Sequence, residues 1–309
     1  MSAERAAVHE RVAAPGQAAV RERLRAARGF VFDMDGTLVL GDASNHGLRA
    51  LPGAVELTRW LAQRGVPYVV FTNGTGRTPR DYAGALRSIG FTLPDQAMLT
   101  PASSAADLFV RRGYRRVLAL GGDGLAVPLR EAGLEVVAPG GKPEVDAVLI
   151  GWYREFTMDS LESACHAAWN GAAVYSASQA RFFATSAGRT LGTSRAIAAM
   201  IKDLTACRIH VAGKPALEAL RCAGRRLGLR LKDLAVVGDD PSLEVPMAHR
   251  GGALAIAVST GLGGAQDYAG LPERRRPHLL LGGVDELLLL CAGGQEAGGQ
   301  GAREQGARE

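Results

Sequence analysis

Short apolar segments alternate with amphipathic stretches through most of the chain. Strands are expected at residues 30–32, 66–71, 209–212, 234–237 and 253–258, and helices at 53–64, 80–89, 216–227 and 243–250, with a last strand and helix within 278–290. Apolar runs of this length, separated by helical periodicity, are typical of strands buried on both faces. The pattern therefore predicts a parallel α/β fold.

The middle of the chain repeats this pattern on its own. Strands are expected at 117–120, 147–150 and 173–175, and helices at 124–131 and 158–169. We therefore expect a second α/β domain at 101–206, inserted into a first domain made of residues 29–100 and 207–290. The boundary is uncertain by about ten residues, because Pro101 and Gly113 both interrupt the pattern.

Both ends differ from this pattern. Residues 1–28 are mainly Ala, Arg and Glu, and we interpret them as an N-terminal extension with a short helix at 17–27. Residues 291–309 are mainly Gly, Gln, Ala, Arg and Glu, which predicts a disordered C-terminal tail because such a composition buries little apolar surface.

Composition excludes several classes of protein. The net charge of +5 is modest, and the first 28 residues, with six Arg and three Glu, account for +3 of it, so no nucleic-acid partner is expected. The sequence has no run of about 18 apolar residues, so no membrane span is expected. The four cysteines have no CxxC spacing, so neither a disulfide framework nor a zinc site is expected. This cysteine usage favours a reducing, cytoplasmic location.

The segment Asp33-Met34-Asp35-Gly36-Thr37 directly follows the first apolar strand. Alternation along an extended chain points Asp33 and Asp35 the same way, beyond the carboxyl end of that strand, where open α/β sheets bind ligands. A calcium loop of the EF-hand type is excluded, because its glycine would be sixth and its glutamate twelfth, whereas Gly36 is fourth and Ser44 is twelfth. The remaining alternative is two surface acids in a turn.

Three later strand ends carry further polar side chains: Thr72-Asn73, Lys214 before Pro215, and Asp239 after Val-Val-Gly. Each has a simpler explanation, namely an ordinary turn, a solvated lysine, and, for Asp240 and Glu244 nearby, a helix cap and a first-turn charge. Together they are more informative. Clustered carboxylates ionise only beside cations, and one ammonium plus one divalent metal would offset the repulsion among Asp33, Asp35 and Asp239.

In order and spacing, these four groups resemble the four motifs of the haloacid dehalogenase (HAD) superfamily. The insertion resembles the C2 cap of the NagD and p-nitrophenyl-phosphatase-like branch, with similar landmarks at residues 51–54, 121–125, 151–153 and 213–215. The likeness covers about residues 29–290. It implies a Rossmann-like parallel-sheet core with an inserted α/β cap.

The resemblance also implies residue roles. Asp33 would be the nucleophile that forms an aspartyl-phosphate, and Asp35 the general acid and then the general base. Mg²⁺ would be held by the Asp33 and Asp239 carboxylates and the Asp35 backbone carbonyl. The phosphoryl group would be bound by the following residues: Gly36, Thr72, Asn73 and Lys214.

The chain departs from the family pattern in two places. The fourth motif usually ends in aspartate, where this chain has Glu244, so Glu244 or Asp240 would take the supporting acidic role. The cap segment that commonly reads Thr-Asn-x-Asp is here Ser-Ala-Ser-Gln, at residues 176–179. Arg181, Arg189 and Arg195 lie in or beside the Gly, Ser and Thr-rich stretch that follows, and we expect either a contact with the leaving group or ordinary solvated arginines.

The resemblance therefore implies a Mg²⁺-dependent phosphomonoesterase acting on a small phosphorylated metabolite, such as a sugar phosphate, a nucleoside monophosphate or a polyol phosphate. It also implies a homodimer formed through the cap. Two alternatives remain: a catalytically silent protein that binds a phosphorylated ligand or regulates a partner, and a phosphotransferase that passes the phosphoryl group to an acceptor other than water.

Overall fold

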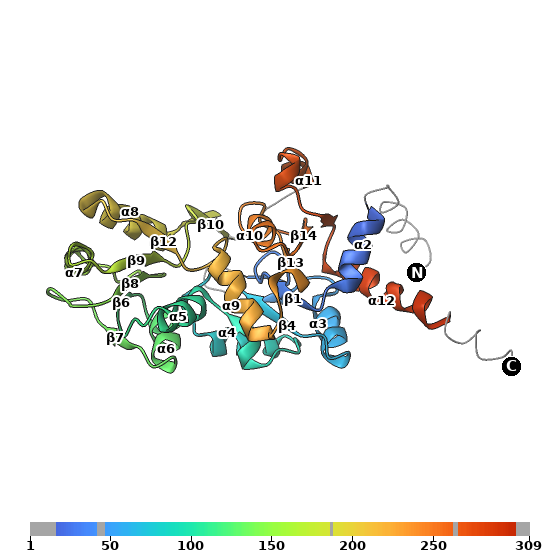
Figure 1. Cartoon of the computed structure of the whole chain (residues 1–309), viewed down its shortest axis with the longest axis horizontal. Helices are drawn as coiled ribbons and strands as arrows, with labels where there is room; N and C mark the ends of the chain where they lie inside the picture. The colour runs from blue at the N-terminus through green and yellow to red at the C-terminus, as the bar shows by residue number, and fades with distance from the viewer. Residues whose placement is uncertain (1–16, 42–46, 186–187, 262–264, 301–309) are drawn as a thin grey trace.

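The computed structural model describes residues 17–41, 47–185, 188–261 and 265–300. These residues form two parallel sheets with helices packed around them, and in Figure 1 the first sheet lies near the middle of the view and the second on the left. The first sheet has six strands, which in spatial order are β15 (Leu279–Leu281), β14 (Leu254–Val258), β13 (Leu234–Gly238), β1 (Gly29–Phe32), β4 (Tyr68–Phe71) and β5 (Met98–Leu99). The second has five, in the order β12 (Ile209–Val211), β9 (Ala173–Ser176), β8 (Ala147–Ile150), β6 (Arg116–Leu120) and β7 (Glu135–Val137).

Helices cover both sheets. Those around the first sheet are α2 (Gln17–Ala26), α3 (Ala54–Gln63), α4 (Pro79–Ser88), α9 (Leu217–Leu227), α10 (Glu244–Gly251), α11 (Ala265–Ala269) and α12 (Val284–Gln300). Those around the second are α5 (Pro101–Arg111), α6 (Asp123–Glu131), α7 (Met158–Trp169) and α8 (Thr193–Thr205). Central strands β1, β4, β13 and β14 are buried throughout, as continuous apolar runs require when both faces are covered. The mixed α/β class with parallel sheets is confirmed.

Smaller elements connect these units. Two antiparallel pairs are β2 (Val39–Leu40) with β3 (Arg49–Ala50) and β10 (Phe182–Thr185) with β11 (Gly188–Leu191). The 3₁₀ helices are η1 (Asp95–Ala97), η2 (Leu231–Asp233) and η3 (Glu273–Arg275). The sequence analysis did not include α5 or α8 among the expected helices. No helix in the described part of the chain is long and apolar enough to cross a membrane.

The strand expected at 209–212 belongs to a different sheet from the one we expected. As β12 it pairs in parallel with β9, through Ile209 opposite Val174, at the edge of the second sheet. Its residues are only partly buried, as suits an edge strand, and short apolar runs do not reveal which sheet they join. We therefore propose that the inserted domain extends to about residue 212.

The two ends of the described chain also pack on the first sheet. The expected N-terminal helix is present as α2, and its Leu24 is only 6% exposed within the main apolar core. The prediction of a disordered tail from residue 291 is wrong for residues 291–300, because α12 continues to Gln300. Leu287 and Cys291 pack against the core and anchor the helix. Once a helix has formed, extending it by one residue avoids the unfavourable nucleation step.

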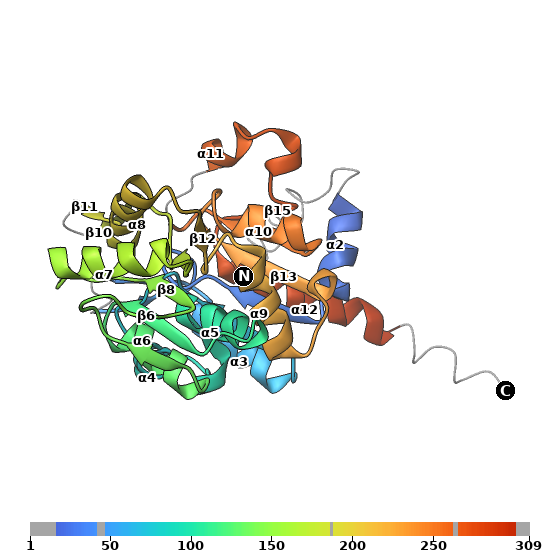
Figure 2. The same cartoon turned by 60° about the vertical axis from the view of Figure 1, so that its left-hand side comes forward.

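The two sheets are joined through α5 and α9, which lie side by side in Figures 1 and 2. Arg225 on α9 donates from Nε to Asp107 on α5 at 3.0 Å, and Arg111 on α5 pairs with Glu218 on α9 at 3.0 Å. The Cys222 thiol is buried between these helices and contacts the carbonyl of Ser103 at 3.8 Å. This joint fixes the second sheet beside the carboxyl ends of the first.

His278 makes the edge of the first sheet sensitive to acid. Its Nδ1 accepts the Ala255 N–H at 2.9 Å, which requires an unprotonated nitrogen. Burial, followed by the charges of Arg23 and His249, lowers the pKa of His278 from 6.5 to about 4. Between these two values the unfolded chain binds more protons than the folded one, so folding stability falls as the pH falls.

We predict that replacing His278 by Asn flattens this pH dependence, because an amide oxygen accepts the same hydrogen bond and does not titrate. The measurement is urea unfolding at about pH 7 and about pH 4.5. After allowance for solvent screening of a half-buried group, the native chain should lose about 1 kcal/mol more than the variant on acidification. His166→Asn on α7 is the matched control and should retain the native pH slope. An unchanged slope for the His278 variant would contradict the prediction.

Candidate active site

The site lies where three neighbouring strands end. Phe32 of β1 is in register with Val237 of β13 on one side and with Val70 of β4 on the other. Asp33, Thr72 and Asp239 therefore emerge from the same edge of the sheet. The chain leaves β1 toward β4 on one side and returns as β13 on the other, which makes this edge a topological switch point, the usual ligand site of an open parallel sheet.

The loop after β1 is a tight turn. The N–H groups of Leu38 and Val39 both donate to the carbonyl of Met34, at 2.9 and 3.0 Å, and the Gly36 N–H donates to Val39 at 2.8 Å. Gly36 has a φ of +85°, which favours glycine, and a Cβ there would lie 2.5 Å from Asp239 Oδ2. A glycine at this position therefore lets the Asp239 carboxylate lie against the turn that carries Asp33.

Lys214 is the cation of the site. It follows β12 and is only 1% exposed. Its Nζ is hydrogen-bonded to Asp33 Oδ1 and forms an ion pair with Glu244 Oε1 at 2.8 Å. Burial alone would lower the pKa of Lys214, but Asp33 and Glu244 more than offset this and raise it above its ordinary value. The ammonium is therefore charged at neutral pH.

Asn73 holds the backbone of Lys214. Its Nδ2 donates to the Lys214 carbonyl at 3.0 Å, while its Oδ1 accepts the Lys214 N–H at 2.9 Å. Asn73 was expected among the phosphate-binding residues, and its side chain is hydrogen-bonded to the Lys214 backbone. Thr72 Oγ1 donates to Asp35 at 3.2 Å and accepts the Gly74 N–H at 3.0 Å, so the end of β4 and the Asp33 turn are also linked.

Asp35 lies in a different environment from Asp33. Its side chain is exposed at the rim, yet it is surrounded by protein atoms on its inner side and lies near the Asp33 carboxylate. Desolvation and then the negative charge of Asp33 raise the pKa of Asp35 from 3.8 to about 7, although Lys214 partly opposes the shift. Its carboxyl group therefore carries a proton for much of the time near neutral pH.

Buried charge is concentrated at this one site. Within the described part of the chain, the buried charged side chains are Asp33, Lys214, Asp239 and Glu244, with exposures of 8%, 1%, 3% and 2%. Three carboxylates and one ammonium leave a net charge of −2 when all are ionised. Such an excess is costly in a desolvated site unless a cation balances it.

The two acids after Asp239 have different partners. Asp240 Oδ1 accepts the N–H and hydroxyl of Ser242, at 2.7 and 2.6 Å, so Asp240 caps the loop before α10. Glu244 points inward, pairs with Lys214, and accepts the Asp240 N–H at 3.2 Å through Oε2. Glu244 therefore lies where the supporting acid was expected. Burial raises the pKa of Glu244, and Lys214 partly opposes this.

Some residues at the site were not singled out from the sequence. Thr37 Oγ1 donates to Asp33 Oδ2 at 3.1 Å, and Thr260 Oγ1 donates to the Gly36 carbonyl at 2.6 Å. Tyr268 donates its hydroxyl to the Asp239 carbonyl at 2.6 Å, and a Cβ at Gly261 would lie 2.0 Å from Asp239 Oδ2. The position of Thr260 and Gly261 just after β14, another strand end, was the available signal.

The structure describes the side chains of two of the three cap arginines, Arg181 and Arg195. Arg195 donates to the carbonyl of Gln179 at 2.8 Å and so holds the segment after β9. Arg181 is exposed, and the side chain of Arg189 lies outside the described ones. Within the described part of the chain, neither Arg181 nor Arg195 is hydrogen-bonded to the acidic residues of the site.

We predict that Glu244 contributes more to stability than Asp240 does. Replacing Glu244 by Ala removes a buried partner of Lys214 and leaves a cavity beside a charged ammonium, so the unfolding free energy should fall by about 2–4 kcal/mol. Asp240→Ala, the matched control, loses a loop cap and should cost about 1 kcal/mol. Urea midpoints at neutral pH measure both changes. Equal losses would show that the buried ion pair is not the stronger constraint.

Comparisons with known families agree with this arrangement. Residues 30–135 match the model of haloacid dehalogenase-like hydrolases, and residues 211–287 match a HAD-hydrolase-like model. The first match contains Asp33 to Asn73, and the second contains Lys214 to Glu244. Both halves of the site therefore fall inside matched segments.

Individual relatives cover most of the chain. Rat (Rattus norvegicus) chronophin is 30% identical over 260 residues, which are 81% of this chain and 82% of its own length. The ribonucleotide monophosphatase NagD of Escherichia coli is 26% identical over 251 residues, covering 80% and 93% of the two chains. The structure of a glycerol phosphate phosphatase from Mycobacterium tuberculosis in complex with calcium superposes with a TM-score of 0.73 at 26% identity, covering 86% of this chain and 76% of that one. This chain belongs to the haloacid dehalogenase-like hydrolases, in their NagD-like branch.

Proposed function

We propose that the protein is a divalent-metal-dependent phosphomonoesterase that hydrolyses a small phosphorylated metabolite through an aspartyl-phosphate on Asp33. The observation that carries the proposal is the burial of Asp33, Asp239, Glu244 and Lys214 together at the carboxyl edge of the first sheet, where three carboxyl groups accompany a single ammonium. The phosphatase names of relatives that cover most of this chain support the same reaction class.

Asp33 is oriented for nucleophilic attack. Its Oδ1 is held by Lys214 and its Oδ2 accepts from Thr37, so the plane of the carboxylate is fixed. One carboxylate oxygen forms a bond to phosphorus while the bond from phosphorus to the ester oxygen breaks. Asp35, held by Thr72 and partly protonated near neutral pH, donates its proton to that leaving oxygen.

In the second half-reaction the roles are reversed. Asp35 has lost its proton and accepts one from a water, whose oxygen then attacks phosphorus and releases the Asp33 carboxylate with inorganic phosphate. Lys214, the Thr72 hydroxyl, backbone N–H groups near Gly36 and the backbone N–H of Asn73 would bind the phosphoryl oxygens, and these fixed donors supply most of the charge stabilisation. Asn73 acts through its backbone here, because its side chain holds Lys214.

The residues fit a hard divalent cation such as Mg²⁺. The Asp33 and Asp239 carboxylates and the Asp35 carbonyl are oxygen donors, and the turn at Gly36 lies against Asp239 Oδ2, so both acids belong to one rim. The described residues contain no group of three or more His, Cys, Asp or Glu side chains at a metal-binding spacing, which is compatible with a site that uses only two carboxylates. When bound, Mg²⁺ would neutralise the excess negative charge and favour binding of the phosphoryl group.

The substrate class follows from the cap and from the relatives. Relatives act on nucleoside monophosphates and on glycerol phosphate, as their names state, so the shared element is a small phosphate monoester. In this chain the acid expected at residue 179 of the cap is a neutral glutamine, so neither relative's substrate is transferred. We also propose a cytoplasmic location, supported by four cysteines that are all free.

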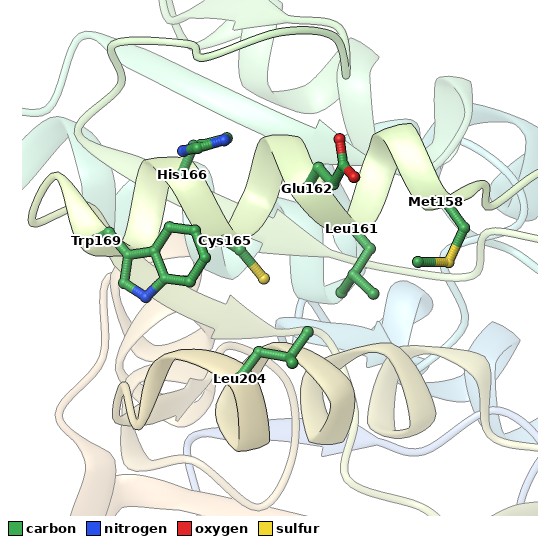
Figure 3. A pocket seen from close by; sticks show the side chains of 7 residues that line it. All are labelled: Met158, Leu161, Glu162, Cys165, His166, Trp169 and Leu204. Atoms are coloured by element: carbon green, nitrogen blue, oxygen red, sulfur yellow. The ribbon is translucent and has the colours of Figure 1, made fainter.

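We further propose a homodimer formed through the inserted domain. Of the eight exposed large apolar side chains among the described residues, five lie between residues 158 and 204, including Met158, Trp169 and Leu204. Figure 3 shows these three around a pocket between α7 and α8, with Leu161 and Cys165 deeper in it. An apolar surface of this kind marks an interaction site in soluble proteins, and the molecular mass in solution tests whether a second copy covers it.

We predict that the protein hydrolyses p-nitrophenyl phosphate only with a divalent cation present and that Asp33→Asn lowers kcat by about 10³-fold or more. Activity should disappear with a chelator and return with added Mg²⁺. Asp123→Asn, at the first residue of α6 outside the site, is the control for loss of one acid. Turnover of no member of a broad phosphate panel would favour a silent regulator, and product release only with added alcohols would favour a phosphotransferase.

We predict that Asp35→Asn separates the two half-reactions. p-Nitrophenolate leaves without a proton, so the first step should remain fast, while the water attack should slow by about 10²–10⁴-fold for lack of a base. Rapid mixing should then show a burst of about one equivalent of p-nitrophenol per site, followed by slow turnover. An equal slowing of both phases would contradict the assigned role.

A further inference from the structure

The loop between β4 and α4, residues 72–78, faces two ways. On one side Thr72 and Asn73 contact Asp35 and the backbone of Lys214. On the other side Thr75, only 4% exposed, accepts the Trp152 N–H at 2.8 Å through its Oγ1. Trp152 follows β8, a strand of the second sheet, so this hydrogen bond joins the inserted domain to the loop that holds the phosphate-binding residues.

Two glycines of the inserted domain allow the same contact. A Cβ on Gly124, in the first turn of α6, would lie 2.3 Å from the Thr75 carbonyl oxygen and 2.6 Å from that of Arg77. A Cβ on Gly151, directly after β8, would lie 2.8 Å from Thr75 Oγ1. The first clash is with backbone atoms, which do not rotate away. Both positions therefore require glycine for a direct approach of the two chain segments.

We infer that Thr75 is a positioning residue: by docking residues 72–78 on the strand ends of the second sheet, it sets where Thr72 and Asn73 meet the phosphoryl group. Gly124 and Gly151 form the matching surface. The inference rests on the proposed phosphatase function and adds a role for the inserted domain. Besides covering the site, this domain holds one wall of the phosphate subsite in place. The Thr75 hydroxyl oxygen acts on the Trp152 N–H and not on the substrate.

The test compares Thr75→Val, which keeps the shape and loses the acceptor, with Thr75→Ser, which keeps the hydroxyl, in the full chain. For Thr75→Val, the KM for p-nitrophenyl phosphate and the inhibition constant of inorganic phosphate should both rise about tenfold, the effect of losing one hydrogen bond. The value of kcat should change less. Thr75→Ser should stay within about twofold of the native chain for both constants.

Amide hydrogen exchange supplies a readout that does not depend on turnover. The Trp152 amide and residues 72–78 should exchange faster in Thr75→Val than in the native chain or Thr75→Ser. Thr157→Val is the matched control, because Thr157 also accepts an N–H in the inserted domain, from Ser160 at 3.2 Å, but caps α7 away from the loop. It should leave KM, the phosphate inhibition constant and exchange in residues 72–78 unchanged.

Gly124→Ala covers the case in which Thr75→Val does not fold, since its added methyl group should weaken phosphate binding by displacing the same loop. Native phosphate inhibition and native exchange in Thr75→Val, or an equal effect of Thr157→Val, would overturn the inference. Failure of the proposed function would give a different result, because the native chain would then hydrolyse no phosphate ester. Two measurements would still decide the role of Thr75: amide exchange in residues 72–78, and phosphate binding measured by calorimetry.

Discussion

The arrangement of the whole site depends on one buried ammonium. Lys214 lies between Asp33, in the turn after β1, and Glu244, at the start of α10, and its own backbone is held by Asn73 from the end of β4. Four separate segments therefore meet at a single residue. A buried charge is tolerated only where such partners surround it, so each segment is constrained by the need to satisfy the same group.

The position of Lys214 in the chain explains how the two sheets are coupled. It follows β12, an edge strand of the second sheet, yet its side chain enters the first. A Cβ on Gly213 would lie 2.4 Å from the Ala177 carbonyl and 2.5 Å from Asn73 Oδ1, so the backbone is tightly enclosed there. The cation of the site is thus supplied by the end of the inserted domain.

The segment after β9 is the part of the cap nearest to that junction. Ser176 donates to the Ser178 carbonyl at 2.7 Å, and the Gly213 N–H donates to the Ala177 carbonyl at 3.1 Å. The Gln179 Nε2 that follows is buried and has no hydrogen-bond partner among the described residues.

The sequence by itself determined the strand ends of the site. Asp33, Thr72 and Asp239 each follow a buried apolar run, and parallel strands bring such positions to one edge whatever the details of packing. The class of fold and the family followed from the same segments. The contacts of individual side chains were harder to predict from the sequence. The sequence does not reveal that the Asn73 side chain holds the Lys214 backbone, nor that Glu244 faces inward while Asp240 binds Ser242.

Only the tertiary structure decided the rest. Strand β12 joined the second sheet because strand partners are chosen by long-range pairing, which a three-residue apolar run does not encode. Helix α12 continued through a glycine-rich stretch because Leu287 and Cys291 pack on the core, and this packing outweighs a weak local propensity. The contact of Thr75 with Trp152 joins positions 77 residues apart in the chain, and such contacts exist only once both sheets have formed.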